Sequence, residues 1–500
     1  MLVYVITTAC EKNSQISNGT LQKNSTSLTK IIIMKKTYPL LAFLFSCLTL
    51  SATTFNVGST HTYKTPNSLY LANVVQDGDI IEIDAETFSG NDCLAVWNKD
   101  NLLIKGIGGR PHLIANGAYI WGKGIWVLAG DNITVENIEF EGAVVPDQNG
   151  AGIRLDGSGL TVRYCYFHDN EMGILTNNTE MGTIDIQYSE FNHNSYGDGY
   201  SHNLYVGRVS KLIFKFNYSH HSSIGHNLKS RAQENYILYN RIMDEQTGDS
   251  SRLIDLPNGG FSIIMGNSLM QGENAPNHNL LGYGLEGLSN TLNEIYIINN
   301  TFVNKRATGL FLDIEEGTSM INISNNIFAG IGSIFNGTPT IMTNNFISTS
   351  IANLNFVDEN NYDYNLMSNS PAIDYGTTIS PVNGNSLTPD FSYLHPQSEI
   401  ARNNENVIDA GAYEYNTSLS IVDNPTQTLV FYPNPFTDNI LIKGVVLKKS
   451  DIAIYNSLGQ DFTNLIDIKI HEDIIQINTT NLPHGIYVLK TSTFVNKVYK

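Results

Sequence analysis

The sequence predicts an all-β protein in which a long parallel β-helix solenoid is followed by a small antiparallel β-sandwich. The first indication is a repeat, because His202-Asn203-Leu204-Tyr205-Val206 and His226-Asn227-Leu228-Lys229-Ser230 carry one pattern 24 residues apart. The second is a strand-like phrase of alternating hydrophobic residues that recurs between residues 135 and 328. Self-similarity at a period of about 20 to 50 residues is typical of solenoids, whose repeats bury their apolar sides against one another.

One position of the phrase can be followed from coil to coil. Its intervals are 27, 24, 27, 24, 27, 33 and 26 residues, and the period-2 alternation around it favours strands over helices. The residues at this position are Phe140, Phe167, Phe191, Tyr218, Ile242, Leu269, Phe302 and Phe328. An asparagine recurs just before it at Asn240, Asn267, Asn300 and Asn326. We predict that these amides stack as a hydrogen-bonded ladder where each coil bends.

The elements follow in order along the chain. Residues 54–92 are predicted to cap the first coil with a short helix over 66–76, a turn at Asp77-Gly78 and a strand, since an open strand edge needs cover. Coils occupy about 93–350 and fade into a closing region to 415, so that the β-helix domain spans 54–415. A linker at 416–428 leads to 429–500, where strands alternate with Pro, Gly and Asn turns, as in a small β-sandwich.

The N-terminal segment is interpreted as a targeting signal. Residues 34–52 have a basic start, an apolar run too short to span a bilayer, and small residues at Ser51 and Ala52, which is typical of a secretory signal peptide. Because such signals stand at the true N-terminus, we expect translation to begin at Met34. Residues 1–33 would then come from an over-extended gene model, and 1–52 would be absent from the mature protein.

Charge and cysteine content limit the partners. Without residues 1–52, 24 basic and 46 acidic residues remain, a net charge of −22, so sequence-independent binding to nucleic acid is not expected. Cys93 and Cys165 would lie about three coils apart, too far for a disulfide at ~4.8 Å per coil. We expect a monomer without a transmembrane segment.

Three resemblances add to this interpretation. Through Tyr432-Pro433-Asn434-Pro435-Phe436, Ile454-Tyr455-Asn456 and Leu482-Pro483-His484-Gly485, the last 14 percent or so of the chain resembles the C-terminal sorting domain of type IX secretion substrates in Bacteroidetes. That resemblance implies export, removal of the module, and release or attachment at the outer membrane. The central 300 residues resemble right-handed parallel β-helix proteins of the pectate-lyase-like superfamily. A further likeness, through Lys229-Ser230 followed by Asn235 and Asn240, is to alginate and chondroitin lyases of β-helix type.

Strand alternation places a column of reactive groups on the solenoid surface. If Leu204, Leu228 and Ile254 point inward, Tyr205, Lys229 and Asp255 point outward on successive coils about 4.8 Å apart. Asn203, Asn227, His202, His226, Arg231, Arg252 and Arg154 are the neighbouring candidates for binding a substrate. Asp255 and Asp156 could instead hold a calcium ion through oxygen ligands. His168, His193, His220 and His221 are interpreted as surface residues in turns.

This column suits an acidic polysaccharide. Cleavage of a uronate polymer by β-elimination needs a cation at the carboxylate, a base for the C5 proton and an acid at the leaving oxygen, and C5 epimerisation shares the first steps. Lys229, crowded by the like charge of Arg231, is the expected base, Tyr205 the proton donor, and Arg231 a carboxylate binder. Hydrolysis is less favoured, because the column shows no close pair of outward carboxylates.

A non-catalytic glycan-binding or adhesion protein is the alternative, since a solenoid offers a long binding face without chemistry. Lys229 and Arg231 distinguish the two functions, because binding alone would more naturally use a row of outward aromatic residues.

The targeting interpretation is directly testable. Protein collected from the native host is expected to begin near Thr53 and to lack residues 430–500, as N-terminal sequencing and intact mass would show. Recovery of residues 1–33 in the mature protein would refute the proposed start site.

Overall fold

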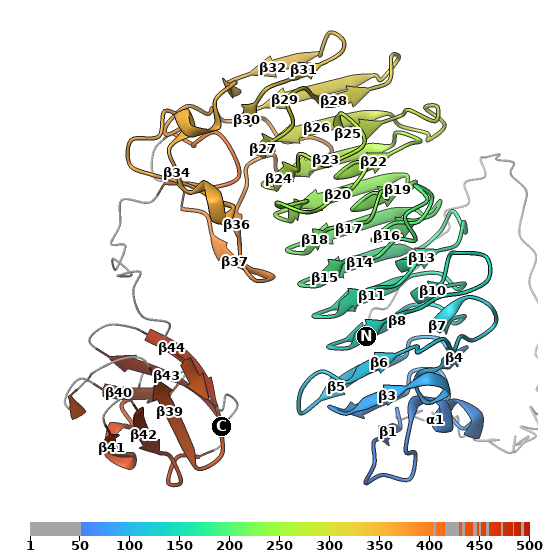
Figure 1. The fold of residues 1–500 in the computed structure, drawn as a ribbon, viewed down its shortest axis with the longest axis vertical. Coiled ribbons are helices and arrows are strands. Elements are labelled where there is room, and N and C mark those ends of the chain that lie inside the picture. Colours follow the sequence, from blue (N-terminus) through green and yellow to red (C-terminus); the bar gives the residue numbers. More distant parts are fainter. Residues whose placement is uncertain are drawn as a thin grey trace, which may run out of the picture. The chain divides into compact units, whose positions relative to one another are not determined.

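The computed structural model describes residues 52–403, 407–415 and most of 430–500, with gaps at 433–435, 444–447, 450–451, 457–459, 472–473, 484 and 492–494. The predicted linker 416–428 and nearly all of the predicted signal 34–52 lie outside the described residues. From Thr54 the chain winds into coils whose strands stack in three parallel sheets (Figure 1). The predicted all-β solenoid is therefore confirmed.

Each full coil contributes one strand to each sheet. Sheet A contains β1 (Thr54–Val57), β2 (Ile80–Asp84), β5 (Leu103–Ile107), β8 (Ile133–Glu136), β11 (Leu160–Arg163), β14 (Thr183–Gln187), β17 (Lys211–Lys215), β20 (Glu234–Leu238), β23 (Phe261–Met265), β26 (Glu294–Ile298), β29 (Met320–Ser324) and β32 (Ile341–Thr343). Sheet B contains β3 (Thr87–Ser89), β6 (His112–Ile114), β9 (Glu139–Glu141), β12 (Tyr166–His168), β15 (Glu190–Asn192), β18 (Tyr218–His220), β21 (Arg241–Met243), β24 (Ser268–Gln271), β27 (Thr301–Asn304), β30 (Ile327–Gly330) and β33 (Phe346–Ser348). Sheet C contains β4 (Ala95–Trp97), β7 (Gly124–Leu128), β10 (Ala151–Leu155), β13 (Met172–Thr176), β16 (Leu204–Val206), β19 (Leu228–Ser230), β22 (Ile254–Leu256), β25 (Asn279–Tyr283), β28 (Leu310–Ile314) and β31 (Ser333–Phe335).

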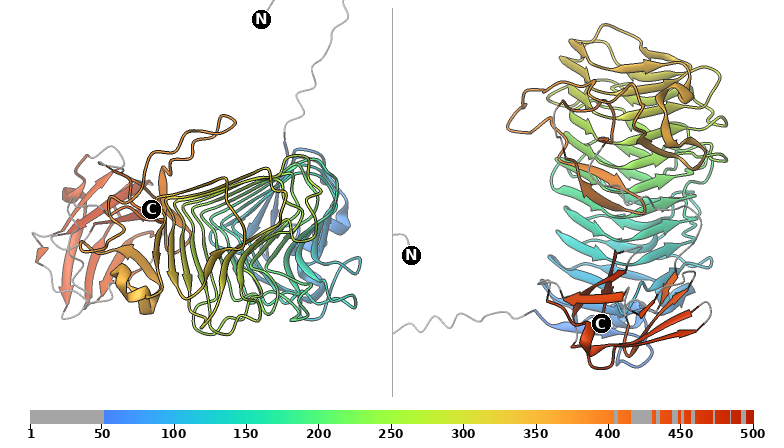
Figure 2. Two further views of the ribbon diagram at one scale, coloured as in Figure 1. Left: turned by 90° about the horizontal axis from the view of Figure 1, so that it is seen from above. Right: turned by 90° about the vertical axis from the view of Figure 1, so that its left-hand side faces the viewer.

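The core is a set of inward columns that continue from coil to coil. Phe140, Phe167 and Phe191 are fully buried and stack with ring centroids 4.9 and 5.0 Å apart. Seen from above, the backbones of successive coils superpose (Figure 2). Such stacking explains why an apolar period of 24 to 27 residues suffices to build one continuous core.

The predicted asparagine ladder is confirmed and is longer than expected. The Oδ1 of Asn267 accepts hydrogen bonds from the backbone N and Nδ2 of Asn240, both at 2.9 Å, and Asn267 donates in the same way to Asn300. Asn217 precedes this run and Asn345 ends it. Each buried amide is thereby satisfied, as a polar group inside a solenoid must be.

The inward placement predicted for Tyr218 is wrong. Ser219, not Tyr218, pairs with Phe191 and Ile242, because the ladder residue Asn217 stands two positions before it, as Asn240 stands before Ile242. Tyr218 therefore points out of sheet B, and Phe214 instead brings a ring to within 6.0 Å of the ring of Phe191. His168 and His220, interpreted as turn residues, also lie in strands of sheet B.

A short helix caps the first coils, as predicted. Helix α1 (Pro66–Ala72) begins at Thr65, whose side chain accepts from the backbone N of Ser68, and Leu69 buries itself in the core. It ends four residues earlier than expected, because Asn73 adopts a left-handed conformation that stops the helix. A short 3₁₀ turn, η1 (Gly90–Cys93), packs against it.

The closing region covers the outer side of sheet B. It comprises η2 (Ile351–Leu354), β34 (Phe356–Asp358), η3 (Glu359–Asn361), β35 (Asp363–Leu366), β36 (Phe391–Leu394) and β37 (Ser398–Ala401). Tyr364, Tyr393 and Tyr413 form an apolar cluster with Met243 and Met270 of sheet B. The repeat fades after about residue 350 because the chain leaves the coils at β33 and continues in two short antiparallel pairs.

The C-terminal module is a separate β-sandwich. One antiparallel sheet contains β38 (Val430–Tyr432), β39 (Asn439–Lys443), β42 (Ile474–Asn478) and β41 (Asp467–His471), and the other contains β40 (Ile452–Asn456), β43 (Ile486–Thr491) and β44 (Val495–Tyr499), with η5 (Thr463–Leu465) between them in sequence. Ile440, Ile477, Ile454 and Leu489 from the two sheets share one core. The predicted architecture of this module is confirmed.

Two further observations concern the described residues. Cys93 and Cys165 are buried and unpaired, and burial raises the pKa of each thiol to about 12. Within the described part of the chain, no helix has the length and apolar character needed to cross a membrane.

The ladder makes a stability prediction. Asn267→Ala leaves the backbone N of Asn240 and the carbonyl of Ile237 without their partners, and each unsatisfied buried group costs about 1–3 kcal/mol. The melting temperature should fall markedly, whereas Asn353→Ala, at an exposed position, should leave it nearly unchanged. Equal melting temperatures for the two variants would contradict a stabilising role for the ladder.

Candidate active site

Sheet C carries the predicted column. Tyr205 of β16 pairs with Lys229 of β19, and Lys229 pairs with Asp255 of β22. The residues before them, Leu204, Leu228 and Ile254, are fully buried, so alternation places the three polar side chains on the outer face. The predicted register of the three residues on adjacent coils is therefore present in the structure, and the chemical roles assigned to them stay predictions.

Asp255 lies at the base of the site rather than at its surface. Its side chain is 2% exposed and receives Arg252 Nη1 at 3.2 Å, Lys229 Nζ at 3.5 Å and His226 Nε2 at 3.5 Å. Burial raises the pKa of Asp255, and the charges of Arg252 and Lys229 oppose that rise. The next residue of the column is Gly282, where a Cβ would come within 3.0 Å of Asp255 Oδ1, so the lack of a side chain makes room for this carboxylate. Asp255 thus fixes the positions of Lys229 and Arg252.

Glu286, which the sequence pattern did not single out, bridges two of the predicted residues. It lies in the loop between β25 and β26, and its carboxylate meets Lys229 Nζ at 3.0 Å through Oε1 and Arg231 Nη2 at 2.6 Å through Oε2. Burial alone would raise the pKa of Glu286, but the hydrogen bonds from Arg231 and Lys229 outweigh it and lower the pKa. The side chain remains 47% exposed. Lys229 and Arg231 therefore form a clamp for a carboxylate at the surface of sheet C.

The sequence signals an insertion at this coil but not the position of Glu286 over the column. The 33-residue interval between Leu269 and Phe302 marks an insertion in this coil. Within it, Gly284 and Gly287 adopt positive φ angles of 75° and 104°, which allow the loop to turn back over the column.

Arg231 joins the clamp to Tyr205. Its Nε donates to the Tyr205 hydroxyl at 2.8 Å, and its Nη1 donates to Asn258 Oδ1 at 2.6 Å. The charged groups of Lys229 and Arg231 also lie 5.6 and 5.7 Å from the centre of the Tyr205 ring, within the range of cation–π attraction. These contacts fix the hydroxyl of Tyr205 beside a guanidinium.

The two predicted histidines underlie the column. The rings of His202 and His226 stack with centroids 4.7 Å apart, and the edge of His202 meets the ring of Tyr205 at 5.5 Å. Burial lowers the pKa of both imidazoles well below its usual value, so both are neutral at neutral pH. Neutral rings can donate or accept a hydrogen bond, but they add no positive charge to the site.

The outward placement predicted for Asn203 and Asn227 is wrong. Both are fully buried, because the chain bends between sheets B and C and turns two successive side chains inward. Asn203 Nδ2 donates to Asn227 Oδ1 at 2.9 Å, and Asn227 Nδ2 continues to Ser250 Oγ and to Asp244 Oδ1. They form a second internal ladder rather than a substrate contact.

Arg154 and Asp156 lie farther along sheet C. Arg154 shares the column but is separated from Tyr205 by Leu175. Asp156 is paired with Lys123 and with Arg154, and β10 lies four strands from β22 in the sheet, about 19 Å at ~4.8 Å per strand. Asp255 and Asp156 therefore cannot share one calcium ion, and each already has cationic partners.

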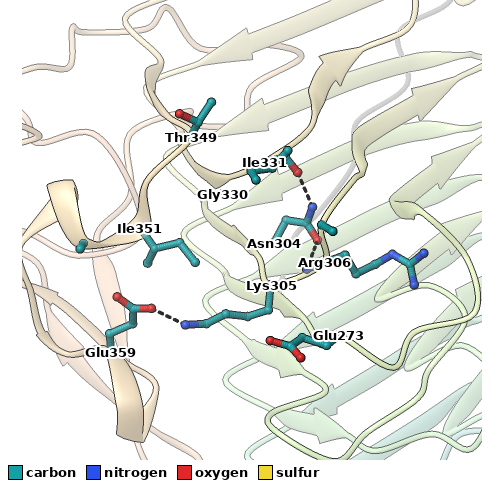
Figure 3. A pocket seen from close by; sticks show the side chains of 11 residues that line it. Glu273, Asn304, Lys305, Arg306, Gly330, Ile331, Thr349, Ile351 and Glu359 are labelled. Carbon is teal, nitrogen blue, oxygen red and sulfur yellow. Dashed lines mark hydrogen bonds and ion pairs between the residues drawn. The ribbon is translucent and has the colours of Figure 1, made fainter.

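A further cleft lies away from the sheet C column. It has a volume of about 690 Å³ and opens between β27, β30 and the closing region, where Lys305 is paired with Glu359 across it (Figure 3). Glu273 and Arg306 add one charge of each sign to its wall. Among the described residues that line it, the single lysine is already paired with a carboxylate and tyrosine is absent. The cleft therefore lacks the grouping of proton-transfer residues found on sheet C.

Comparison with known proteins supports this architecture. Residues 430–500 match the secretion system C-terminal sorting domain, and residues 67–204 match the right handed beta helix region. Among solved structures, the crystal structure of pectate lyase Pel9A is similar, with a TM-score of 0.50 and 15% identity over 73% of this chain and 98% of that chain. At this identity the likeness concerns the fold. No curated protein sequence matches the chain.

These matches establish two properties. The chain is a β-helix protein that ends in a type IX sorting domain, and the sorting domain makes it a secreted or cell-surface protein.

The internal ladder beside the site predicts a pH dependence. Burial raises the pKa of Asp244, at the end of the Asn203–Asn227 ladder, to about 6. A carboxyl group with a raised folded-state pKa stabilises the fold fully below its unfolded value and loses that contribution as pH rises through the folded value. A rise from the ordinary pKa of about 4 to about 6 corresponds to a loss of about 3 kcal/mol between those two pH values. Relative to Asp244→Asn, the wild-type protein should therefore lose stability over this range in urea unfolding, and parallel curves would contradict the assignment.

Proposed function

We propose that this exported protein acts on a uronate-containing polysaccharide at the sheet C column, by β-elimination or by C5 epimerisation. The observation that carries the proposal is the carboxylate clamp, in which Lys229 and Arg231 together hold the carboxylate of Glu286. Glu286 stands on a loop and is nearly half exposed, so an incoming sugar carboxylate can take its place between the same two cations. Bidentate binding by arginine and a second cation gives both charge neutralisation and orientation.

The contacts suggest a division of labour that differs from the sequence-based expectation. The ammonium group of Lys229 donates to Glu286 and forms an ion pair with Asp255, so it is suited to deliver a proton rather than to take one. The Tyr205 hydroxyl accepts a hydrogen bond from the Arg231 guanidinium, which holds the phenol oxygen in place beside the clamp, where the C5 proton of a bound uronate would lie. We therefore assign the base to Tyr205 and the acid to Lys229.

The proposed reaction has two steps. With the sugar carboxylate in the clamp, the acidity of the C5 proton rises, and Tyr205 removes that proton. In elimination, the electron pair forms the C4=C5 double bond, the C4–O bond breaks, and Lys229 protonates the leaving oxygen. In epimerisation the C4–O bond stays intact, and Lys229 instead gives its proton to the face of C5 opposite Tyr205.

The direction of the column suits a polymer. Neighbouring coils are ~4.8 Å apart, so a chain that runs along the solenoid axis passes Asp255, Lys229, Tyr205 and then Arg154, about two coils farther on. Arg154 is a candidate for a second uronate carboxylate. In this proposal Arg231 and Lys229 supply the positive charge at the sugar carboxylate.

Hydrolysis and glycan binding without turnover are the two alternative functions. Asp255 and Glu286 do bring two carboxylates to one lysine, which the repeat pattern did not predict and which hydrolysis would need. Asp255 is almost fully buried and bound by three partners, however, so it is poorly placed to reach a glycosidic oxygen. Glycan binding without turnover is the remaining alternative, and Tyr205 is the single aromatic member of the column between β10 and β22.

A screen against a panel of uronate polysaccharides tests the proposal. Elimination creates an ultraviolet-absorbing double bond, and epimerisation exchanges the C5 proton with deuterated solvent. Lys229→Ala and Tyr205→Phe should each lower kcat by about 10²- to 10⁴-fold, the usual cost of a lost proton-transfer group. Lys305→Ala, in the cleft between sheet B and the closing region, is the control and should retain activity. Binding without turnover would favour the glycan-binding function, and full activity in Lys229→Ala would contradict the role assigned to Lys229.

The clamp makes a separate prediction about Glu286. Glu286→Gln removes the negative charge that occupies the clamp, so KM for the uronate polymer should fall about tenfold or more, the equivalent of about 1.4 kcal/mol. Glu315→Gln is the matched control, because this exposed acidic residue follows β28, three strands along sheet C from Lys229. A rise in KM for Glu286→Gln would show that Glu286 assists binding instead of competing with it.

A further inference from the structure

A cluster of two histidines and two glutamates lies on the outer face of sheet B, apart from the sheet C column. It consists of His112 of β6, Glu139 and Glu141 of β9, and His168 of β12, so three successive coils contribute. The intervening residues Leu113, Phe140 and Phe167 are fully buried, which turns all four side chains outward. None of these residues has a part in the proposed reaction.

We propose that this cluster binds one divalent transition-metal ion, with zinc as the ion that its ligand set fits best. Its four potential ligand atoms all lie within 4.8 Å of one another. Two imidazole nitrogens with two carboxylate oxygens form a set that suits zinc and related metals, whereas calcium prefers oxygen ligands alone.

The distances fit a tetrahedral site. His112 Nε2 lies 2.6 Å from Glu141 Oε2 and 3.3 Å from Glu139 Oε1, and His168 Nε2 lies 3.1 and 3.9 Å from Glu139 Oε1 and Glu141 Oε2. Ligand bonds of about 2.0–2.2 Å at tetrahedral angles separate neighbouring ligand atoms by about 3.4 Å. The four measured separations lie on both sides of that value, so small side-chain rotations bring all four atoms to one ion.

The environment of His168 provides an independent argument. Its Nδ1 lies 2.7 Å from Asp169 Oδ2, while its Nε2 lies 3.1 Å from the Glu139 carboxylate. A neutral imidazole has one N–H and can satisfy one of these two carboxylates, so the other contact is repulsive unless a cation or a second proton stands between. A carboxylate on the second nitrogen is the arrangement that orients histidine ligands at metal sites.

The neighbouring residues hold this orientation. The ring of Tyr166 stacks on His168 with centroids 4.3 Å apart, and the Tyr166 hydroxyl accepts a hydrogen bond from Asn192. All four candidate ligands are protein side chains, which is the pattern of a structural rather than a catalytic site. The ion would join three coils near the N-terminal end of the solenoid and so stabilise them.

The test uses untagged full-length protein, stripped with a chelator and titrated with zinc by calorimetry. We expect one zinc ion per chain and a higher melting temperature on addition of zinc. Cobalt in its place should give the strong visible absorption of a tetrahedral site. His168→Ala should lose stoichiometric binding, and His193→Ala, just after β15 of the same sheet but outside the cluster, should retain it.

Asp169→Asn separates ligation from folding, because Asp169 touches His168 and is not one of the four ligands. It should weaken zinc binding by about 10- to 100-fold, the usual effect of losing such an orienting group. Absence of stoichiometric zinc binding by the wild-type protein would overturn the proposal and identify the cluster as an ion-pair network of protonated histidines. Undiminished binding in both His168→Ala and Asp169→Asn would overturn it as well.

Discussion

In-register stacking of parallel strands is the constraint on which the other features of the structure depend. Once the backbone of each coil pairs with the next, residues of equal parity fall into columns that run along the axis. Inside, the columns are stacked rings and asparagine ladders, and a slip of one residue would bury charge and expose the core. Outside, the same register brings Tyr205, Lys229 and Asp255 together, although they are far apart in sequence.

The two carboxylates at the column differ in how deeply they are buried, and this difference sets their roles. Asp255 is buried and surrounded by cations, so its carboxylate fixes Lys229 and Arg252. Glu286 is also bound by cations, Lys229 and Arg231, but it stands on an exposed loop. A ligand can therefore displace its carboxylate from these two residues. A buried anchor below and a replaceable carboxylate above is an arrangement that can exchange one anion for another without disturbing the fold.

The sequence predicts much of this, and its failures have physical reasons. Period-2 alternation places Tyr205, Lys229 and Asp255 correctly, because it holds wherever the chain is extended. It fails for Asn203 and Asn227, which stand at a bend where two successive side chains face inward. The inward placement of Tyr218 fails because aromatic character marks the inward position less reliably than the ladder asparagine two residues before it. Glu286 belongs to an insertion, and no repeat pattern predicts where an inserted loop folds back.

The most direct measurement compares the binding of an oligouronate with that of the same oligosaccharide after its carboxylates are reduced to alcohols. Calorimetry with the Tyr205→Phe variant avoids turnover while it leaves Lys229 and Arg231 in place. If the clamp recognises carboxylates, the reduced sugar should bind about tenfold more weakly or worse, and the affinity of the oligouronate should fall as salt rises. Equal affinity for the two sugars, unaffected by salt, would contradict the assignment of this site.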